Sequence, residues 1–116
     1  MRYARQVRIE DQSLRDAIER AERGIVDADL GGGIIKQRVA RTGQGRSGGF
    51  RLLIAYRSGN RAVFLYGFAK NERDNIGADE LKTLQEIGAG WLESKKELLE
   101  HAIKEGVLRE VSYEDT

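Results

Sequence analysis

The sequence lacks cysteine altogether. The protein therefore has no disulfide bond, no zinc–thiolate site and no thiol nucleophile. No apolar run approaches the roughly 18 residues of a membrane span, and the chain does not open with a signal-peptide pattern. Its one histidine, His101, has no second histidine with which to share a metal ion. We expect a cytoplasmic protein that uses no membrane contact, metal ion or other cofactor.

The composition is that of one ordered domain. The chain has 116 residues, of which 40% are hydrophobic and 34% are charged. This length is enough for one modest hydrophobic core, and this balance is typical of an ordered globular protein. The sequence shows neither an internal repeat nor a linker, so we expect a single domain over residues 1–116.

Charge is distributed unevenly along the chain, although the net charge is only +1. Residues 1–30 are close to neutral. Residues 31–73 contain nine lysines and arginines but one glutamate, a net charge of +8, whereas residues 74–116 have a net charge of −6. A block of one sign attracts polyanions whatever the charge of the whole chain. The basic segment predicts nucleic-acid binding; the alternative is a solvated sheet face whose arginines serve only solubility.

The N-terminal part predicts an amphipathic helix from Asp11 to Gly24. Its apolar residues recur at i, i+3, i+4 and i+7, which places them on one face, and Gly24 suits the left-handed position after the helix end. Three glycines, residues 31–33, then interrupt the chain. The apolar residues of this helix are Leu14, Ala17, Ile18 and Ala21.

The basic segment contains three runs rich in branched and aromatic residues, which are typical of strands. In the first run, alternation places Lys36 and Arg38 on one face. A glycine-rich loop, residues 42–49, follows it, and Ser58-Gly59-Asn60 joins the other two runs as a hairpin. The three predicted strands are Ile34–Arg41, Phe50–Arg57 and Arg61–Ala69.

The C-terminal part predicts two helices. The first carries an apolar stripe that ends with Trp91, a predicted core residue; the second opens with a capping box at Ser94 and closes at Gly106. We expect these acidic helices to cover the sheet face opposite the basic residues, and Val107–Tyr113 to form a last edge strand. The fold class is then α+β, with a small antiparallel central sheet between an N-terminal helix and C-terminal helices.

The basic segment has the residues for metal-independent cleavage of RNA. It contains no Walker loop and almost no carboxylates, whereas two-metal nucleases need acidic ligands. Cleavage without metal requires deprotonation of the 2′-hydroxyl, stabilisation of the charged phosphorane and protonation of the leaving oxygen. Arginine only donates and suits the phosphorane, while Lys36 or Lys70, crowded by other cations, can serve as acid or base.

Residues 27–76 resemble the RelE/ParE superfamily of toxins from type II toxin–antitoxin systems, especially its HigB-like and phage-derived members. The resemblance rests on the order of the elements: helix, glycine break, basic strand, a strand that begins Gly49-Phe50-Arg51, hairpin, and a cluster Lys70-Asn71-Glu72-Arg73. It covers nearly half of the chain.

The resemblance implies a metal-independent endoribonuclease, an mRNA interferase of the hydrolase class, that binds RNA and cleaves mRNA in the ribosomal A site. It also implies a cognate antitoxin, a DNA-binding protein from an adjacent gene. Two alternatives stay open: a ParE-like toxin that poisons DNA gyrase, and a degenerate member that binds only its antitoxin or DNA. Five candidate catalytic residues follow from the resemblance and the chemistry, together with three candidate RNA-binding residues. The catalytic candidates are Lys36, Arg38, Arg51, Lys70 and Arg73, and the binding candidates are Arg41, Arg46 and Arg57.

The sequence departs from the family pattern in three places. Ile76-Gly77 stands where relatives have a tyrosine or histidine, and Asn71 replaces an arginine expected in the basic cluster. Relatives also begin with a strand before the first helix, and we expect this chain to start too late to contain it. We therefore expect the first family strand to be missing, and the exposed sheet edge to favour a homodimer.

Overall fold

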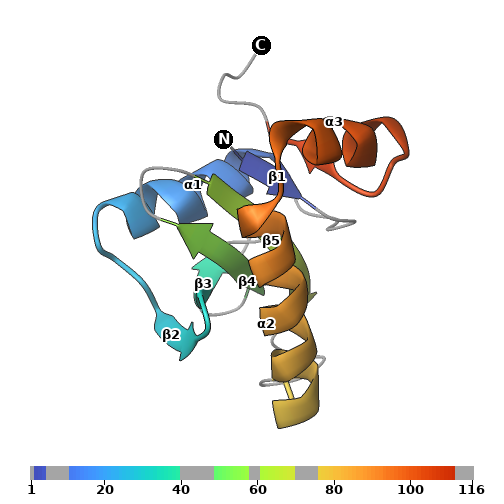
Figure 1. Cartoon of the computed structure of the whole chain (residues 1–116). Coiled ribbons are helices and arrows are strands. Elements are labelled where there is room, and N and C mark those ends of the chain that lie inside the picture. Colours follow the sequence, from blue (N-terminus) through green and yellow to red (C-terminus); the bar gives the residue numbers. More distant parts are fainter. Residues whose placement is uncertain (1, 5–10, 40–48, 58–60, 70–75, 112–116) are drawn as a thin grey trace.

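The structure is a computed structural model that describes residues 2–4, 11–39, 49–57, 61–69 and 76–111. Within these ranges the strands are β1 (Arg2–Ala4), β2 (Ala28–Gly31), β3 (Ile34–Val39), β4 (Phe50–Arg57), β5 (Arg61–Ala69) and β6 (Arg109–Glu110), and the helices are α1 (Asp11–Glu22), α2 (Ala78–Glu93) and α3 (Lys96–Lys104). The strands form one sheet in the order β2-β3-β4-β5-β1-β6. Figure 1 shows α2 crossing in front of this sheet.

Each face of the sheet carries its own hydrophobic core. On one face, residues such as Ile35, Leu52 and Phe64 pack with Leu14 and Ile18 of α1. On the other face, residues such as Ile34, Val63 and Leu65 pack with Leu92 of α2 and Leu99 of α3. The fold is therefore α+β, as predicted, with one helix layer on each side of the sheet.

Helix α1 matches the predicted amphipathic helix but ends at Glu22, two residues before the glycine predicted to close it. Gly24 has a φ of +80°, a conformation that residues with a Cβ rarely adopt. The Gly24 N–H donates to the Ala21 carbonyl at 2.9 Å, and the Ile25 N–H donates to the Arg20 carbonyl at 2.8 Å. These two bonds form a Schellman motif, which satisfies carbonyls at the helix end.

Strands β4 and β5 have the predicted bounds and β3 has its predicted start, while β2 was not predicted. Strand β2 ends at Gly31, the first residue of the expected glycine break, and pairs antiparallel with β3. Helix α2 approaches the sheet closely at Gly88, where an added Cβ would lie 2.9 Å from the Ala55 Cβ. A side chain at this position would push the helix away from β4.

The expectation that the first family strand is missing is wrong. Residues Arg2–Ala4 form β1, which pairs parallel with β5, so the sheet is mixed rather than antiparallel. Tyr3 and Ala4 are 2% and 1% exposed because they bury their side chains in the two cores. Strand β6 lies outside β1, as the predicted last edge strand. The edge of β5 is thus covered, which removes the premise for a homodimer through it.

The predicted capping box at Ser94 is also wrong. The Ser94 hydroxyl donates to the Gly90 carbonyl at 2.6 Å and so belongs to the end of α2, while α3 has Lys95 as its N-cap with no side-chain bond. At the start of α2, the Gly77 N–H donates to Glu80 Oε1 at 3.0 Å. No helix in the described ranges has both the length and the apolar character to span a membrane.

Candidate nucleic-acid interface

Three of the candidate catalytic cations lie on one face of the sheet. Arg38 of β3 stands directly opposite Arg51 of β4, and Lys36 stands opposite Leu53. Because directly opposite residues point to the same face, and residues two apart along a strand do as well, Lys36, Arg38 and Arg51 share a face. Arg38 is exposed, Lys36 is half-buried and Arg51 is 7% exposed.

This face is the one that α2 and α3 cover, and the expectation that the acidic helices lie on the opposite face is wrong. The helices occupy its apolar end, where Gly88 of α2 lies against Ile34, Ala55 and Leu65. The same strands continue from these apolar residues into the cations of β3 and β4. The apolar end binds the helices, and the other end carries Lys36, Arg38 and Arg51.

The pairing of Arg38 with Arg51 is of the closer antiparallel type. The Arg38 N–H donates to Asp27 Oδ2 and its carbonyl accepts from Arg20 Nη2, so both groups point away from β4. Such a non-hydrogen-bonded pair has a Cα separation of about 4.5 Å and brings side chains close together. Two cations placed opposite each other on adjacent strands are unfavourable unless anionic groups lie near them.

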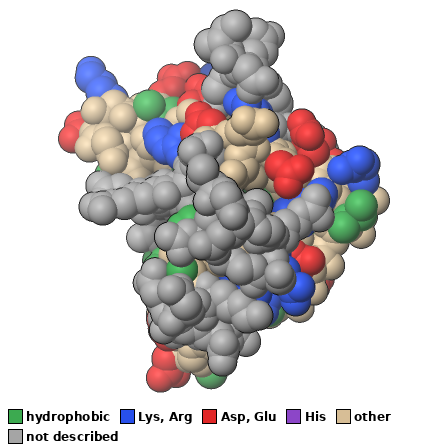
Figure 2. All heavy atoms as spheres, turned by 180° about the vertical axis from the view of Figure 1, so that it is seen from behind, with side chains coloured by type: hydrophobic (Ala, Val, Ile, Leu, Met, Phe, Trp, Pro, Cys, Tyr) green, Lys and Arg blue, Asp and Glu red, His purple; other side chains and the backbone are tan. Residues whose placement is uncertain are grey.

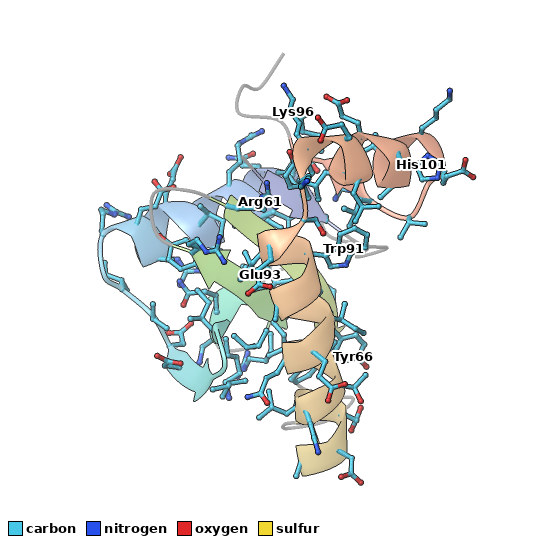
Figure 3. The ribbon with its side chains drawn as sticks, in the orientation of Figure 1. Arg61, Tyr66, Trp91, Glu93, Lys96 and His101 are labelled. Atoms are coloured by element: carbon cyan, nitrogen blue, oxygen red, sulfur yellow. The ribbon has the colours of Figure 1, made fainter. Side chains whose placement is uncertain are left out.

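Arg57, a predicted RNA-binding residue, lies at the far end of β4, six residues and about 20 Å along the strand from Arg51. Its Nη1 donates to the Leu92 carbonyl at 3.1 Å. Arg61, opposite Arg57 on β5, donates from Nη1 to the Trp91 carbonyl at 2.8 Å and to the Ser94 carbonyl at 2.7 Å. Figure 3 shows Arg61 at the C-terminal end of α2. Both arginines therefore hold a helix terminus, where cations are favourable.

The other four candidate cations lie outside the described residues; they are Arg41, Arg46, Lys70 and Arg73. Of the positions where relatives have a tyrosine or histidine, Ile76 is half-buried against the core under α2, and Gly77 precedes that helix. These positions contribute to the start of a helix rather than to proton transfer.

Tyr66 is a surface aromatic residue that the sequence pattern did not single out. A bulge in β5 pairs Leu53 with Tyr66 but the next residue, Ile54, with Phe64. The extra residue turns Tyr66 to the α2 face, where simple alternation from Phe64 would have put it on the α1 face. Its ring lies 5.8 Å from that of Phe68, and Figure 3 shows it beside α2.

Tyr66 lines a groove between α2 and the turn after α3. The groove has a volume of about 760 Å³ and an apolar lining that includes Leu84, Ile87 and Val107. Its charged residues are both acidic, Glu80 and Glu105. This groove is thus opposite in charge to the end of the sheet that carries Lys36 and Arg38.

Among the described residues, no group of three or more histidine, aspartate or glutamate side chains is arranged to hold a metal ion. His101 is exposed, and its Nε2 lies 4.0 Å from Glu105 Oε1 on the surface of α3. Seen from behind in Figure 2, the described surface shows charged side chains of both signs, with hydrophobic side chains in small, separate areas.

The family model described as the RelE toxin of the RelE/RelB toxin–antitoxin system matches residues 1–111. The chain belongs to the RelE toxin family. The match includes β1, in agreement with the first strand found at residues 2–4. No curated protein matches the chain. As a RelE-family toxin, the protein has an antitoxin as its partner in a toxin–antitoxin system.

Proposed function

We propose that this RelE-family toxin is a cytoplasmic, metal-independent endoribonuclease that binds mRNA in the ribosomal A site and cleaves it. The observation that supports this most strongly is the shared face of Lys36, Arg38 and Arg51. Two opposed arginines next to a lysine match the needs of a phosphodiester cleavage that develops negative charge on the phosphorane. Membership of the RelE family identifies the protein as a toxin of a toxin–antitoxin system. We infer the cleavage reaction from this cluster of cations.

In this proposal the three cations have different roles. Arg38, the most exposed, binds the scissile phosphate, and Arg51, opposite it on β4, adds positive charge from a nearly buried position. Lys36 serves as the acid or base of the reaction, since arginine remains protonated and can only donate hydrogen bonds. Lys70 and Arg73 complete the candidate catalytic set, and Arg41 and Arg46 bind the flanking phosphates.

The test is induction of the full-length gene in a bacterium, followed by mapping of mRNA 5′ ends. The wild type is expected to produce new 5′ ends within translated frames, and Arg38→Ala is expected to lose them. Lys104→Ala is the matched control, because it removes one exposed positive charge from α3. DNA damage without mRNA cuts would show a gyrase poison instead, and antitoxin binding without either effect would show a degenerate member.

We also propose that the antitoxin is a DNA-binding protein from an adjacent gene and that it inhibits by covering the basic end of the sheet. Helices α2 and α3 are unsuited to inhibition from within the chain, because Leu92, Leu99 and Ala102 are buried in the core. Co-expression with the neighbouring reading frame should restore growth and yield a stable complex that no longer binds RNA. Persistent toxicity without a complex would contradict this assignment.

A further inference from the structure

The backbone of Arg38 is held by two side chains rather than by a neighbouring strand. In the described part of the chain, the pairing of β2 with β3 ends at Ala28 opposite Lys36. Two residues further on, the Arg38 N–H donates to Asp27 Oδ2 at 2.5 Å, and the Arg38 carbonyl accepts from Arg20 Nη2. An antiparallel neighbour would supply the same pair of bonds. Arg20 and Asp27 thus continue the ladder where β2 stops.

These two side chains are tied to each other and to α1. Arg20 Nη1 lies 3.8 Å from Asp27 Oδ2, and Arg20 Nε lies 3.2 Å from Asp16 Oδ2. Arg20 is 3% exposed. A guanidinium this deeply buried is costly to desolvate unless it is well paired, and its planar fork lets it bond several groups at once.

A buried glutamine fixes Asp27 from the other side. Gln37 is 0% exposed and accepts from the Asp27 N–H at 2.9 Å through Oε1. Its Nε2 donates to the Ala17 carbonyl at 3.0 Å and to the Ile25 carbonyl at 2.8 Å. Asp27 is therefore anchored at its own backbone to α1 and to the loop that follows it.

We propose that Arg20 and Asp27 are positioning residues that hold Arg38 for its contact with RNA, a role that rests on the proposed RNA-cleaving function. Gln37 lies on the α1 face, whereas the side chain of Arg38 emerges on the α2 face. The path of β3 at Arg38 decides where its guanidinium stands relative to Arg51. Two side chains from the α1 side of the sheet thus set the geometry of the basic end on the other side.

The test measures the affinity of the full-length protein for a single-stranded RNA oligonucleotide in fixed salt. Asp27→Ala is expected to weaken RNA binding about fivefold, the equivalent of one hydrogen bond. The loss of a negative charge near a basic surface would by itself strengthen RNA binding. Weaker binding therefore reports on the lost hydrogen bond and not on the lost charge. Asp27→Asn keeps an oxygen acceptor for the Arg38 N–H and should stay within about twofold of the wild type. With Arg38→Ala already present, Asp27→Ala should change the affinity less than about twofold.

The matched control is Asp29→Ala on β2. This substitution removes the same negative charge two residues away. Asp29 Oδ1 accepts a hydrogen bond from the Gly31 N–H and not from Arg38. Amide hydrogen exchange at Arg38 gives a readout independent of RNA: exchange should become faster in Asp27→Ala and stay unchanged in Asp29→Ala.

Three results would overturn the proposal. Equal weakening by Asp27→Ala with and without Arg38 would show a general loss of stability. Unchanged Arg38 exchange in Asp27→Ala would show that the carboxylate does not hold this amide. A wild-type protein that binds no RNA would refute the proposed function and, with it, this positioning role. The hydrogen-exchange result would still report on the hydrogen bond between Asp27 and the Arg38 N–H.

Discussion

Strand β4 carries an arginine near each end, on the same face, and each stands opposite a second arginine. Arg51 is paired with Arg38, and Arg57 is paired with Arg61. The carbonyls at the end of α2 bind the pair at the Arg57 end. At the Arg51 end, the side chain of Arg38 is exposed. The backbone of Arg38 is held by two side chains, those of Arg20 and Asp27, from the opposite side of the sheet. The sequence presents four similar cations, but the structure ties one pair to the end of α2, and we propose that the other pair contacts RNA.

The largest effect is expected at Lys36, where two substitutions distinguish a role in proton transfer from a role of positive charge alone. Lys36→Ala should reduce ribosome-dependent mRNA cleavage by on the order of 100-fold, the lower end of the usual contribution of a general acid or base. Lys36→Arg should remain similarly impaired, since arginine keeps the charge but does not exchange its proton. The measurement is the rate of cleavage by purified protein on programmed ribosomes. Full activity in Lys36→Arg would reduce the role of Lys36 to charge alone.

The next effect concerns the other end of β4. Arg61→Met should lower the free energy of unfolding by about 2 kcal/mol, because the main-chain carbonyls of Trp91 and Ser94 lose a charged donor. RNA affinity, measured where the variant is folded, should remain that of the wild type. Urea unfolding together with RNA titration checks both. A variant with normal stability and weakened RNA binding would reverse the roles assigned to the two ends.

A third effect concerns the helix that covers the sheet between the two ends. Gly88→Ala should destabilise the fold by about 1–3 kcal/mol, the usual cost of overpacking, because the added Cβ would lie 2.9 Å from the Ala55 Cβ. Gly90→Ala is the matched control, since an added Cβ there meets nothing within 4 Å, and alanine favours helix over glycine by about 1 kcal/mol. Thermal unfolding compares the two. Equal stability of the two variants would show that α2 is not seated on β4 at Gly88.

Local pattern predicted the central elements of the fold and the shared face of Lys36 and Arg38. Strands β4 and β5 carry enough branched and aromatic residues to be recognised at their true bounds. Strand β1 has three residues, too few for a pattern, and its partner β5 lies about 60 residues away. A contact that distant leaves no local signal in a short strand.

The parts of the site that sequence missed depend on contacts between distant residues. The bulge that turns Tyr66 to the α2 face exists only in the pairing of β4 with β5. In the sequence, Arg57 has the pattern of a surface cation. Only the structure shows that it donates a hydrogen bond to the end of α2, 35 residues further along the chain. Likewise, nothing local to Arg20 indicates that it bonds the backbone of Arg38. Periodicity assigns a side chain to a face but does not identify its partner.

We propose that the Arg38 end of the sheet contacts RNA and that the Arg57 end does not. The most direct measurement is the salt dependence of RNA binding by Arg38→Ala and Arg57→Ala, two variants that each lose one positive charge. Arg38→Ala should lower the slope of log affinity against log salt by ~0.7, the value for one phosphate contact on a single strand. Arg57→Ala should leave the slope unchanged, because its guanidinium bonds the Leu92 carbonyl. Equal slopes in the two variants, whether both lowered or both unchanged, would contradict the division of roles between the two ends of β4.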